Sequence, residues 1–214
     1  MTRWFEQWLD AFAPTSCVSC KSPGSCLCPA CAAAVQLHPR AVSRVDLSGV
    51  AVSDFDGVAA SIVVAFKDQG RTVLKRWLAD AVAESIRWRF ANELNEPAEL
   101  ELVCLPSTDA AFRRRGYRPN EILTRTVSRV LNLPFRSGVI TFSRQLKDQR
   151  GLNLAERRQN LTESMRSLSP PRRAILVDDV VTTGASLQEA ARALRVSGCQ
   201  VEGFAVFAET LRRT

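Results

Sequence analysis

The chain has 214 residues, of which 46% are hydrophobic and 24% are charged, and its formal net charge is +7. This composition is typical of a soluble globular protein with one main core, here one α/β domain with a small appendage. No uninterrupted apolar run reaches the about 18 residues that a membrane-spanning helix needs, and Glu6 and Asp10 stand where a secretory signal would carry basic residues, so we expect a cytoplasmic protein without membrane insertion.

The N-terminal 42 residues contain a predicted helix and a cysteine cluster. Residues 1–13 carry aromatic and aliphatic side chains at helical spacing, which predicts a short docking helix. Two Cys-x-x-Cys pairs follow, Cys17 with Cys20 and Cys28 with Cys31. Where disulfides do not form, such pairs are best explained by four thiolates around one structural zinc ion. A degenerate site and redox chemistry are the alternatives.

Two further residues near this cluster could compete as metal ligands. Cys26 could substitute for Cys28, although this would break the second Cys-x-x-Cys pair. His38 is the only histidine of the chain, and we interpret it as a surface residue rather than a ligand. A mechanism that needs a histidine base is therefore poorly supported.

Residues 43–92 are predicted to be mainly helical. An irregular or extended connection over residues 43–54 leads into a short apolar helix over residues 58–66, with Gly70 as its expected stop. A second helix, over about residues 71–92, carries an apolar stripe that belongs to the core. Lys67 precedes the glycine turn, where it could reach a bound phosphate or simply keep its ammonium group in solvent at the helix end.

Two strands and a helix are predicted between residues 102 and 142. Residues 102–106 read as a buried strand that a proline ends. Ser107 and Thr108 follow, and an amphipathic helix begins at Pro119. A strand, a hydroxyl-containing turn and a helix form an arrangement that binds anions. Residues 135–142 are expected to form a further strand.

Positive charge is concentrated in the middle of the chain. Between Arg113 and Arg173 there are 15 lysines and arginines against 4 acids, a balance of +11. Such a block attracts phosphates, pyrophosphate or nucleic acid, and it is also consistent with a solvated basic face. Charge alone does not choose among polyanions.

The strongest indication of a ligand-binding site in the sequence lies in residues 174–198. Four apolar residues, 174–177, predict a buried parallel strand that ends on two acids. A turn of small and hydroxyl residues follows, and then an amphipathic helix that Gly198 ends. The N–H groups of such a turn favour a bound phosphate, which Gly184 lets the backbone approach closely. A last strand over residues 200–208 completes the sheet.

The two acids, Asp178 and Asp179, repel each other at the end of a strand and so need an explanation. Vicinal ribose hydroxyl groups, bound directly or through Mg²⁺, would give them a partner. The alternative is a strand that ends in two solvated acids before an ordinary helix.

The whole string resembles the phosphoribosyl pyrophosphate motif of type I phosphoribosyltransferases: a hydrophobic run, Asp-Asp, and Thr-Thr-Gly-x-Ser. The resemblance implies an α/β fold with a mainly parallel sheet flanked by helices. It implies ribose contacts for the two acids and 5′-phosphate contacts for the turn residues Thr182, Thr183, Gly184, Ala185 and Ser186. It further implies a pyrophosphate site, for which we predict the residues Lys67, Ser107, Thr108, Arg144 and Lys147.

Nearly the whole chain is similar to the ComF family, bacterial proteins of this fold that are linked to natural competence and to handling of incoming single-stranded DNA. Besides the motifs above, the resemblance rests on Lys67-x-x-Gly70, on Arg115-Gly116-Tyr117 and on Arg-x-x-Asn-Leu at residues 157–161. The sequence departs from the family at Arg118-Pro119-Asn120, where an asparagine commonly follows the aromatic residue directly. In the superfamily, the segment around residues 143–158 is a hood that closes over the substrate.

The sequence therefore predicts a zinc module over residues 1–42 and a phosphoribosyltransferase-like domain over residues 43–214. The resemblance implies binding of magnesium phosphoribosyl pyrophosphate or a nucleotide-like relative, with transfer to an acceptor that the sequence does not identify. One alternative is a non-catalytic protein that binds single-stranded DNA and works with DNA-uptake proteins. A second alternative is a sensor that binds phosphoribosyl pyrophosphate and changes its binding to a partner.

Overall fold

In the computed structural model of the protein, the residues described are 16–96, 98–144 and 161–210. The predicted helix over residues 1–13 and most of the basic segment after residue 144, including Lys147, lie outside these ranges. No helix within them is long and apolar enough to cross a membrane.

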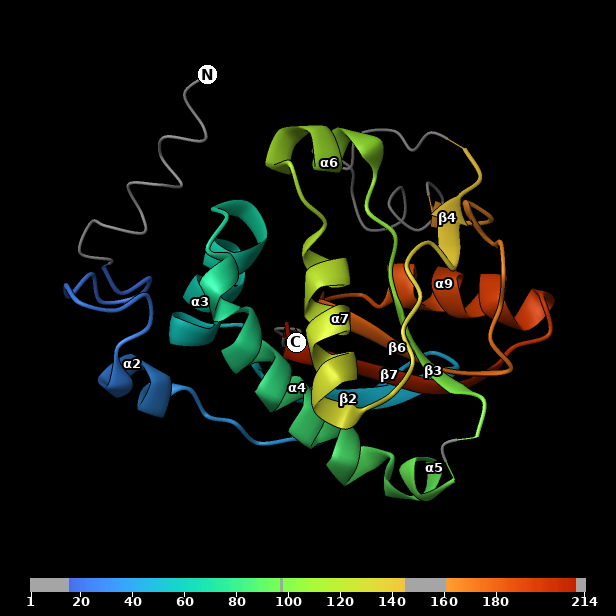
Figure 1. The fold of residues 1–214 in the computed structure, drawn as a ribbon, viewed down its shortest axis with the longest axis horizontal. Helices are drawn as coiled ribbons and strands as arrows, with labels where there is room; N and C mark the ends of the chain where they lie inside the picture. The colour runs from blue at the N-terminus through green and yellow to red at the C-terminus, as the bar shows by residue number, and fades with distance from the viewer. Residues whose placement is uncertain (1–15, 97, 145–160, 211–214) are drawn as a thin grey trace.

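A five-stranded sheet in the order β1-β2-β7-β6-β3 organises the described residues (Figure 1). The strands of this sheet are β1 (Arg40–Arg44), β2 (Leu47–Asp54), β3 (Leu100–Cys104), β6 (Arg173–Val181) and β7 (Gln200–Glu209). In this sheet β1 pairs with β2 in antiparallel fashion, and the other three pairings are parallel. The carboxyl ends of the four parallel strands therefore share one edge, where α/β proteins of this kind bind ligands.

Helices cover both faces of the sheet (Figure 1). One face carries α3 (Gly57–Asp68), α4 (Lys75–Arg89) and α7 (Pro119–Leu131), and the other carries α9 (Ala185–Val196). Side chains of β6 alternate between the two hydrophobic cores, with Ile175 and Val177 in the first and Ala174 and Leu176 in the second. Burial on both faces explains why the strand is a continuous apolar run in the sequence.

Smaller elements lie around this frame. They are α2 (Pro29–Ala34), the 3₁₀ turn η1 (Thr72–Leu74), α5 (Ala91–Asn95), α6 (Asp109–Arg115), and the antiparallel pair β4 (Ile140–Phe142) and β5 (Met165–Ser167). The predicted α/β class with a mostly parallel sheet and flanking helices is confirmed.

The connection predicted over residues 43–54 is instead part of the sheet. It contains the end of β1 and all of β2, which pairs with β7. Hairpin turns usually carry glycine or asparagine where the backbone needs a positive φ, but here Val45 takes φ of 55°. The sequence therefore lacks the usual signal for a hairpin.

Three other boundaries differ from the prediction. The helix predicted over residues 71–92 is divided into η1, α4 and the start of α5, with a break at Phe90. Only residues 140–142 of the strand predicted over 135–142 belong to β4, and Phe135 makes a single bridge to Leu102. Strand β6 continues four residues beyond Val177, because β7 stays paired with it after β3 has ended.

Candidate functional site

The turn between β6 and α9 lines a pocket at the carboxyl edge of the sheet. The pocket has a volume of about 100 Å³, and its lining comprises Leu161, Asp178 and the continuous segment 180–187. Gly184 has φ of +80°, which favours glycine, and a Cβ there would lie 2.7 Å from the Cβ and Cγ atoms of Arg44. Both the backbone conformation and the close approach of Arg44 therefore require glycine.

Backbone donors of this turn are available to a ligand. The N–H of Ala185 donates to the hydroxyl of Thr183, 3.3 Å away. The N–H groups of Thr183 and Gly184 have no acceptor in the parts of the chain that the structure describes. The turn also precedes the N-terminus of a 12-residue helix, whose dipole favours an anion. The arrangement is chemically suited to a phosphate group.

Asp178 lines the pocket and is 8% exposed. Its Oδ1 accepts hydrogen bonds from Nδ2 of Asn120, at 2.7 Å, and from the N–H of Asp179, at 2.9 Å. Burial, and then the negative charge of Asp179, raise the pKa of Asp178 to about 7. This carboxyl group therefore changes its charge near neutral pH.

Asp179 does not line that pocket and is only 1% exposed. Its Oδ1 lies 2.8 Å from Nζ of Lys67, at the C-terminal turn of α3. Burial alone would lower the pKa of Lys67, but the charges of Asp179 and Asp178 outweigh burial and raise it. Lys67, which we predicted to contact pyrophosphate, lies against the acid pair, and its contact with pyrophosphate stays a prediction.

Buried oxygen atoms without partners also mark this cluster. Among the described residues, three buried side-chain polar atoms have no hydrogen-bond partner, and two of them are Asn120 Oδ1 and Asp179 Oδ2. A buried acceptor without a donor is costly. Hydroxyl groups of a ligand could supply the missing donors.

A clamp of two residues fixes the turn that carries Lys67. The hydroxyl of Tyr117 donates toward the carbonyl oxygens of Phe66, at 2.6 Å, and Lys67, at 3.0 Å, and accepts from the N–H of Gly70. Arg115 forms an ion pair with Asp68, at 2.8 Å. The motifs at residues 67–70 and 115–117 therefore form one structural unit.

Three other residues predicted for pyrophosphate, Ser107, Thr108 and Arg144, are described, and none of them lines this pocket. Thr108 is the N-cap of α6, and its hydroxyl accepts from the N–H of Ala111. Ser107 is absent from the pocket lining. Arg144 donates to the carbonyl oxygen of Thr162, 3.2 Å away. The pyrophosphate assignment stays a prediction.

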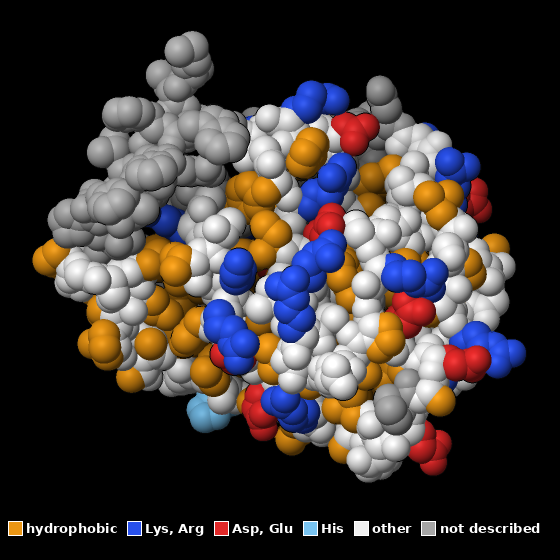
Figure 2. All heavy atoms as spheres, in the orientation of Figure 1, with side chains coloured by type: hydrophobic (Ala, Val, Ile, Leu, Met, Phe, Trp, Pro, Cys, Tyr) orange, Lys and Arg blue, Asp and Glu red, His pale blue; other side chains and the backbone are white. Residues whose placement is uncertain are grey.

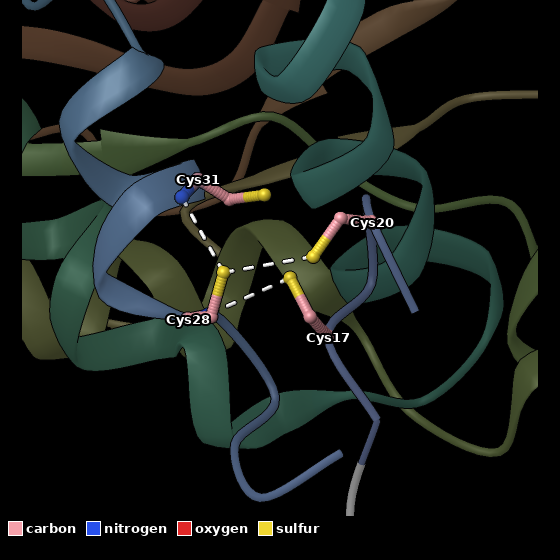
Figure 3. A group of neighbouring side chains, drawn as sticks. All are labelled: Cys17, Cys20, Cys28 and Cys31. Atoms are coloured by element: carbon pink, nitrogen blue, oxygen red, sulfur yellow. Dashed lines mark hydrogen bonds between the residues drawn. The ribbon is translucent and has the colours of Figure 1, made fainter. Parts of the chain in front are cut away.

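The four predicted cysteine ligands come together at a second site (Figure 3). The Sγ atoms of Cys17, Cys20, Cys28 and Cys31 lie within 4.8 Å of one another and face a common centre. The Sγ atoms of Cys20 and Cys28 are 3.6 Å apart, close to the ~3.8 Å that a tetrahedral zinc ion with Zn–S bonds of about 2.3 Å requires. The cluster therefore fits one metal ion.

Local structure explains how these thiols are presented. Cys28 is the N-cap of α2, and its Sγ accepts from the N–H of Cys31. Burial would raise the pKa of the Cys17 thiol, but hydrogen bonds from backbone N–H groups, that of Cys28 first, outweigh burial and lower it to about 6. A thiolate is the form that binds a metal. Cys26 packs instead in the hydrophobic core with Val18 and Val35.

Sequence reasoning missed two residues of the first site. Asn120 belongs to the segment Arg118-Pro119-Asn120, at which the sequence departs from the ComF pattern, and it contacts Asp178 directly. Arg44 lies more than 130 positions before the turn that it touches. The signals for Asn120 were this departure and its place in the first turn of a predicted helix, and Arg44 gave none.

The segment that carries the acid pair and the turn matches a domain of known proteins. Residues 112–214 match the phosphoribosyl transferase domain, so the chain contains the domain that the acid pair and the turn predict. The chain is 31% identical over 145 residues to competence protein F of Haemophilus influenzae, covering 65% of this chain and 62% of that protein. It is 33% identical over 99 residues to the DNA utilization protein YhgH of Escherichia coli O157:H7, covering 45% and 44%.

A second YhgH, from Salmonella typhimurium, is 28% identical over 152 residues, covering 70% of this chain and 66% of that protein. The chain thus spans less than two thirds of the length of the first of these relatives. The chain is thus similar to competence protein F and YhgH and matches the phosphoribosyl transferase domain over residues 112–214, so the predicted ComF resemblance is confirmed.

Proposed function

We propose that the protein binds magnesium phosphoribosyl pyrophosphate, or a related 5′-phosphoribosyl ligand, in the pocket at the end of β6. The observation that carries this proposal is the joint lining of one pocket by Asp178 and the 182–186 turn, inside the segment that matches the phosphoribosyl transferase domain. In this proposal Asp178 accepts hydrogen bonds from the ribose, and the turn binds the 5′-phosphate.

The residues around the acid pair have complementary roles in this proposal. Asp179 contributes its unpartnered Oδ2 to the ribose hydroxyl groups, while Lys67 balances its buried charge. When bound, Mg²⁺ neutralises the pyrophosphate of the ligand. Transfer would displace pyrophosphate by a nucleophile, and the protein would contribute position and charge rather than a covalent residue.

Calorimetric titration of magnesium phosphoribosyl pyrophosphate into the wild type and into Asp178→Asn tests the proposal. We expect the variant to bind at least about tenfold more weakly, because one charged hydrogen-bond acceptor is lost. Asp80→Asn is the matched control, since Asp80 is an exposed acid on α4 that pairs only with Arg76 in the described residues. Absence of binding by the folded wild type would contradict the proposal.

Transfer is tested separately, by pyrophosphate release in the presence of candidate acceptors. Release that depends on an acceptor and disappears in Asp178→Asn would identify the protein as an enzyme. Binding without release for any acceptor would favour a sensor.

The surface of α6 and α7 favours binding of single-stranded DNA as a second candidate function. Figure 2 shows Lys and Arg side chains distributed over these helices. The exposed arginines of this surface are Arg113, Arg114, Arg118, Arg125 and Arg129. The guanidinium of Arg118 lies 4.2 Å from the ring centre of Phe112, and that of Arg125 lies 5.3 Å from the ring of Phe135. In proteins that bind single-stranded DNA, positive charges bind the phosphate backbone and aromatic rings stack on the bases. This surface offers both kinds of group.

This second candidate is tested by fluorescence anisotropy with a labelled oligonucleotide at several salt concentrations. We expect affinity to fall as salt rises, and the salt slope to be smaller in the double variant Arg118→Gln, Arg125→Gln. Asp178→Asn should leave this affinity unchanged. Equal slopes for the wild type and the double variant would exclude this surface.

A further inference from the structure

Arg44, the last residue of β1, reaches across the sheet edge to the 182–184 turn. Its Nε donates to the carbonyl oxygen of Thr182, 3.1 Å away. Its aliphatic stem lies against Gly184, so closely that a Cβ on residue 184 would come within 2.7 Å of it. Its own carbonyl oxygen accepts from Nε2 of Gln188, on the first turn of α9, at 3.0 Å. One residue thus contacts the turn at both ends.

An acid at the end of β7 anchors the guanidinium group. Arg44 forms an ion pair with Glu209, and the two side chains are only 11% and 13% exposed. Arg40, at the other end of β1, pairs with the second oxygen of Glu209, at 3.0 Å, and with Asp54. Because Glu209 stands beside Val181 in the sheet, its charge holds Arg44 next to the turn.

The hydrogen bond from Arg44 to the carbonyl of Thr182 also fixes the direction of the next N–H group, that of Thr183. In a trans peptide the C=O and the following N–H point in opposite directions. A hydrogen bond that holds the carbonyl of Thr182 toward Arg44 therefore directs the N–H of Thr183 away from Arg44. That N–H has no acceptor in the described parts of the chain, and Thr183 lines the pocket.

We infer that Arg44 is a positioning residue, which holds the 182–184 turn in the conformation that presents its N–H groups to the 5′-phosphate. The inference rests on the proposed function for the identity of the ligand. Arg44 does not line the pocket, so its effect on binding is transmitted through the carbonyl of Thr182 and the packing against Gly184.

Arg40 supplies a matched control for this role. Both arginines belong to β1, and both pair with Glu209, so replacement of either removes one charge from the same network. Only Arg44 contacts the turn, through Thr182 and Gly184. The variants Arg44→Met and Arg40→Met keep an unbranched apolar stem and therefore differ mainly in the contact under test.

The experiment compares these two variants in hydrogen exchange and in ligand binding. In the protein without ligand, we expect amides of residues 181–188 to exchange faster in Arg44→Met, and to keep wild-type exchange in Arg40→Met. In calorimetry, Arg44→Met should bind both magnesium phosphoribosyl pyrophosphate and ribose 5-phosphate about tenfold more weakly, while Arg40→Met binds them as the wild type does. A purely structural role of the network would affect both variants alike.

The two readouts separate failure of this inference from failure of the proposed function. If the wild type binds neither ligand but the turn loosens only in Arg44→Met, the proposed function is wrong and the positioning role stands. If exchange and binding are the same in both variants, the inference is overturned. Arg44→Lys serves if Arg44→Met does not fold, because it keeps the charge beside Glu209 but lacks the planar fork that reaches two partners; the same defects, smaller in size, are expected.

Discussion

Asp178 and Asp179 are neighbours in the sequence but have different surroundings. Successive residues of a strand point to opposite faces of the sheet, and β3 ends opposite Val177, so the edge of β6 beyond it is open. Asp178 uses this opening to line the pocket and meet Asn120, whereas Asp179 turns toward α3 and Lys67. The acid pair therefore consists of one carboxyl group that lines the pocket and one that is paired with Lys67 through Oδ1, while its Oδ2 has no partner in the described residues.

The raised pKa of Asp178 predicts a dependence of stability on pH. Its pKa is about 7 in the folded protein and near 3.8 when unperturbed, so the folded state binds more protons between these values. The contribution of Asp178 to the free energy of unfolding should therefore fall as pH rises from about 4 to about 7. Asp178→Asn keeps an oxygen acceptor for Asn120 but carries no charge. Its free energy of unfolding should therefore lack the decrease with pH that ionisation of Asp178 causes.

Thermal unfolding at several pH values measures this effect. At pH 8 we expect Asp178→Asn to have a Tm a few degrees above that of the wild type, about 2–4 °C per kcal/mol for a chain of this size. The difference should shrink toward pH 5, where Asp178 is protonated. Asp80→Asn, at an exposed site, should show no such trend. A Tm for Asp178→Asn below that of the wild type at every pH would contradict the prediction.

Among the elements, the C-terminal turn of α3 depends on a segment 50 residues further along the chain. Tyr117 binds three backbone groups of this turn, and Arg115 pairs with Asp68. Helix α7 begins two residues after Tyr117 and brings Asn120 to Asp178. One short segment thus positions both partners of the acid pair, Lys67 and Asn120.

Replacement of Tyr117 by phenylalanine tests this coupling. Loss of the hydroxyl should destabilise the protein by about 1 kcal/mol, and amides of residues 67–70 should exchange faster. Ser128→Ala is the matched control, because the hydroxyl of Ser128 also bonds a backbone carbonyl, that of Leu133, but lies at the far end of α7. Faster exchange at residues 67–70 in both variants would show general loosening instead of a local clamp.

At the scale of the whole molecule, the cysteine cluster lies beside α3 (Figure 1), and none of its four cysteines lines the pocket at the end of β6. We therefore expect metal binding by the cysteines and ligand binding in the pocket to be independent of each other. The division into residues 1–42 and 43–214 stays a prediction.

Elemental analysis of protein purified without chelator tests the metal site. We expect about one zinc ion per chain, little zinc in Cys20→Ser, and full zinc in Cys104→Ser, since Cys104 lies at the end of β3 outside the cluster. Removal of zinc should lower the Tm of the wild type, because metal binding contributes to folding. Absence of zinc from the wild type would contradict the structural-zinc prediction.

The sequence by itself determined the features whose signal is local. A continuous apolar run predicts a strand buried on both faces, and the glycine and hydroxyl residues after it predict a turn that suits an anion. The paired cysteines, three residues apart in each pair, predict four thiols around one point. The structure confirms the α/β class, the β6–turn–α9 unit and the cysteine cluster.

Only the tertiary structure decided which distant side chains surround the acids and the turn. Lys67, Asn120 and Arg44 come from three elements far from residue 178 in the sequence, and no periodicity links them to it. The hairpin that carries Arg44 was also missed, because Val45 replaces the usual turn glycine. Chemistry carried by consecutive residues is visible in a sequence, whereas partners that meet through packing depend on contacts between elements that local pattern does not encode.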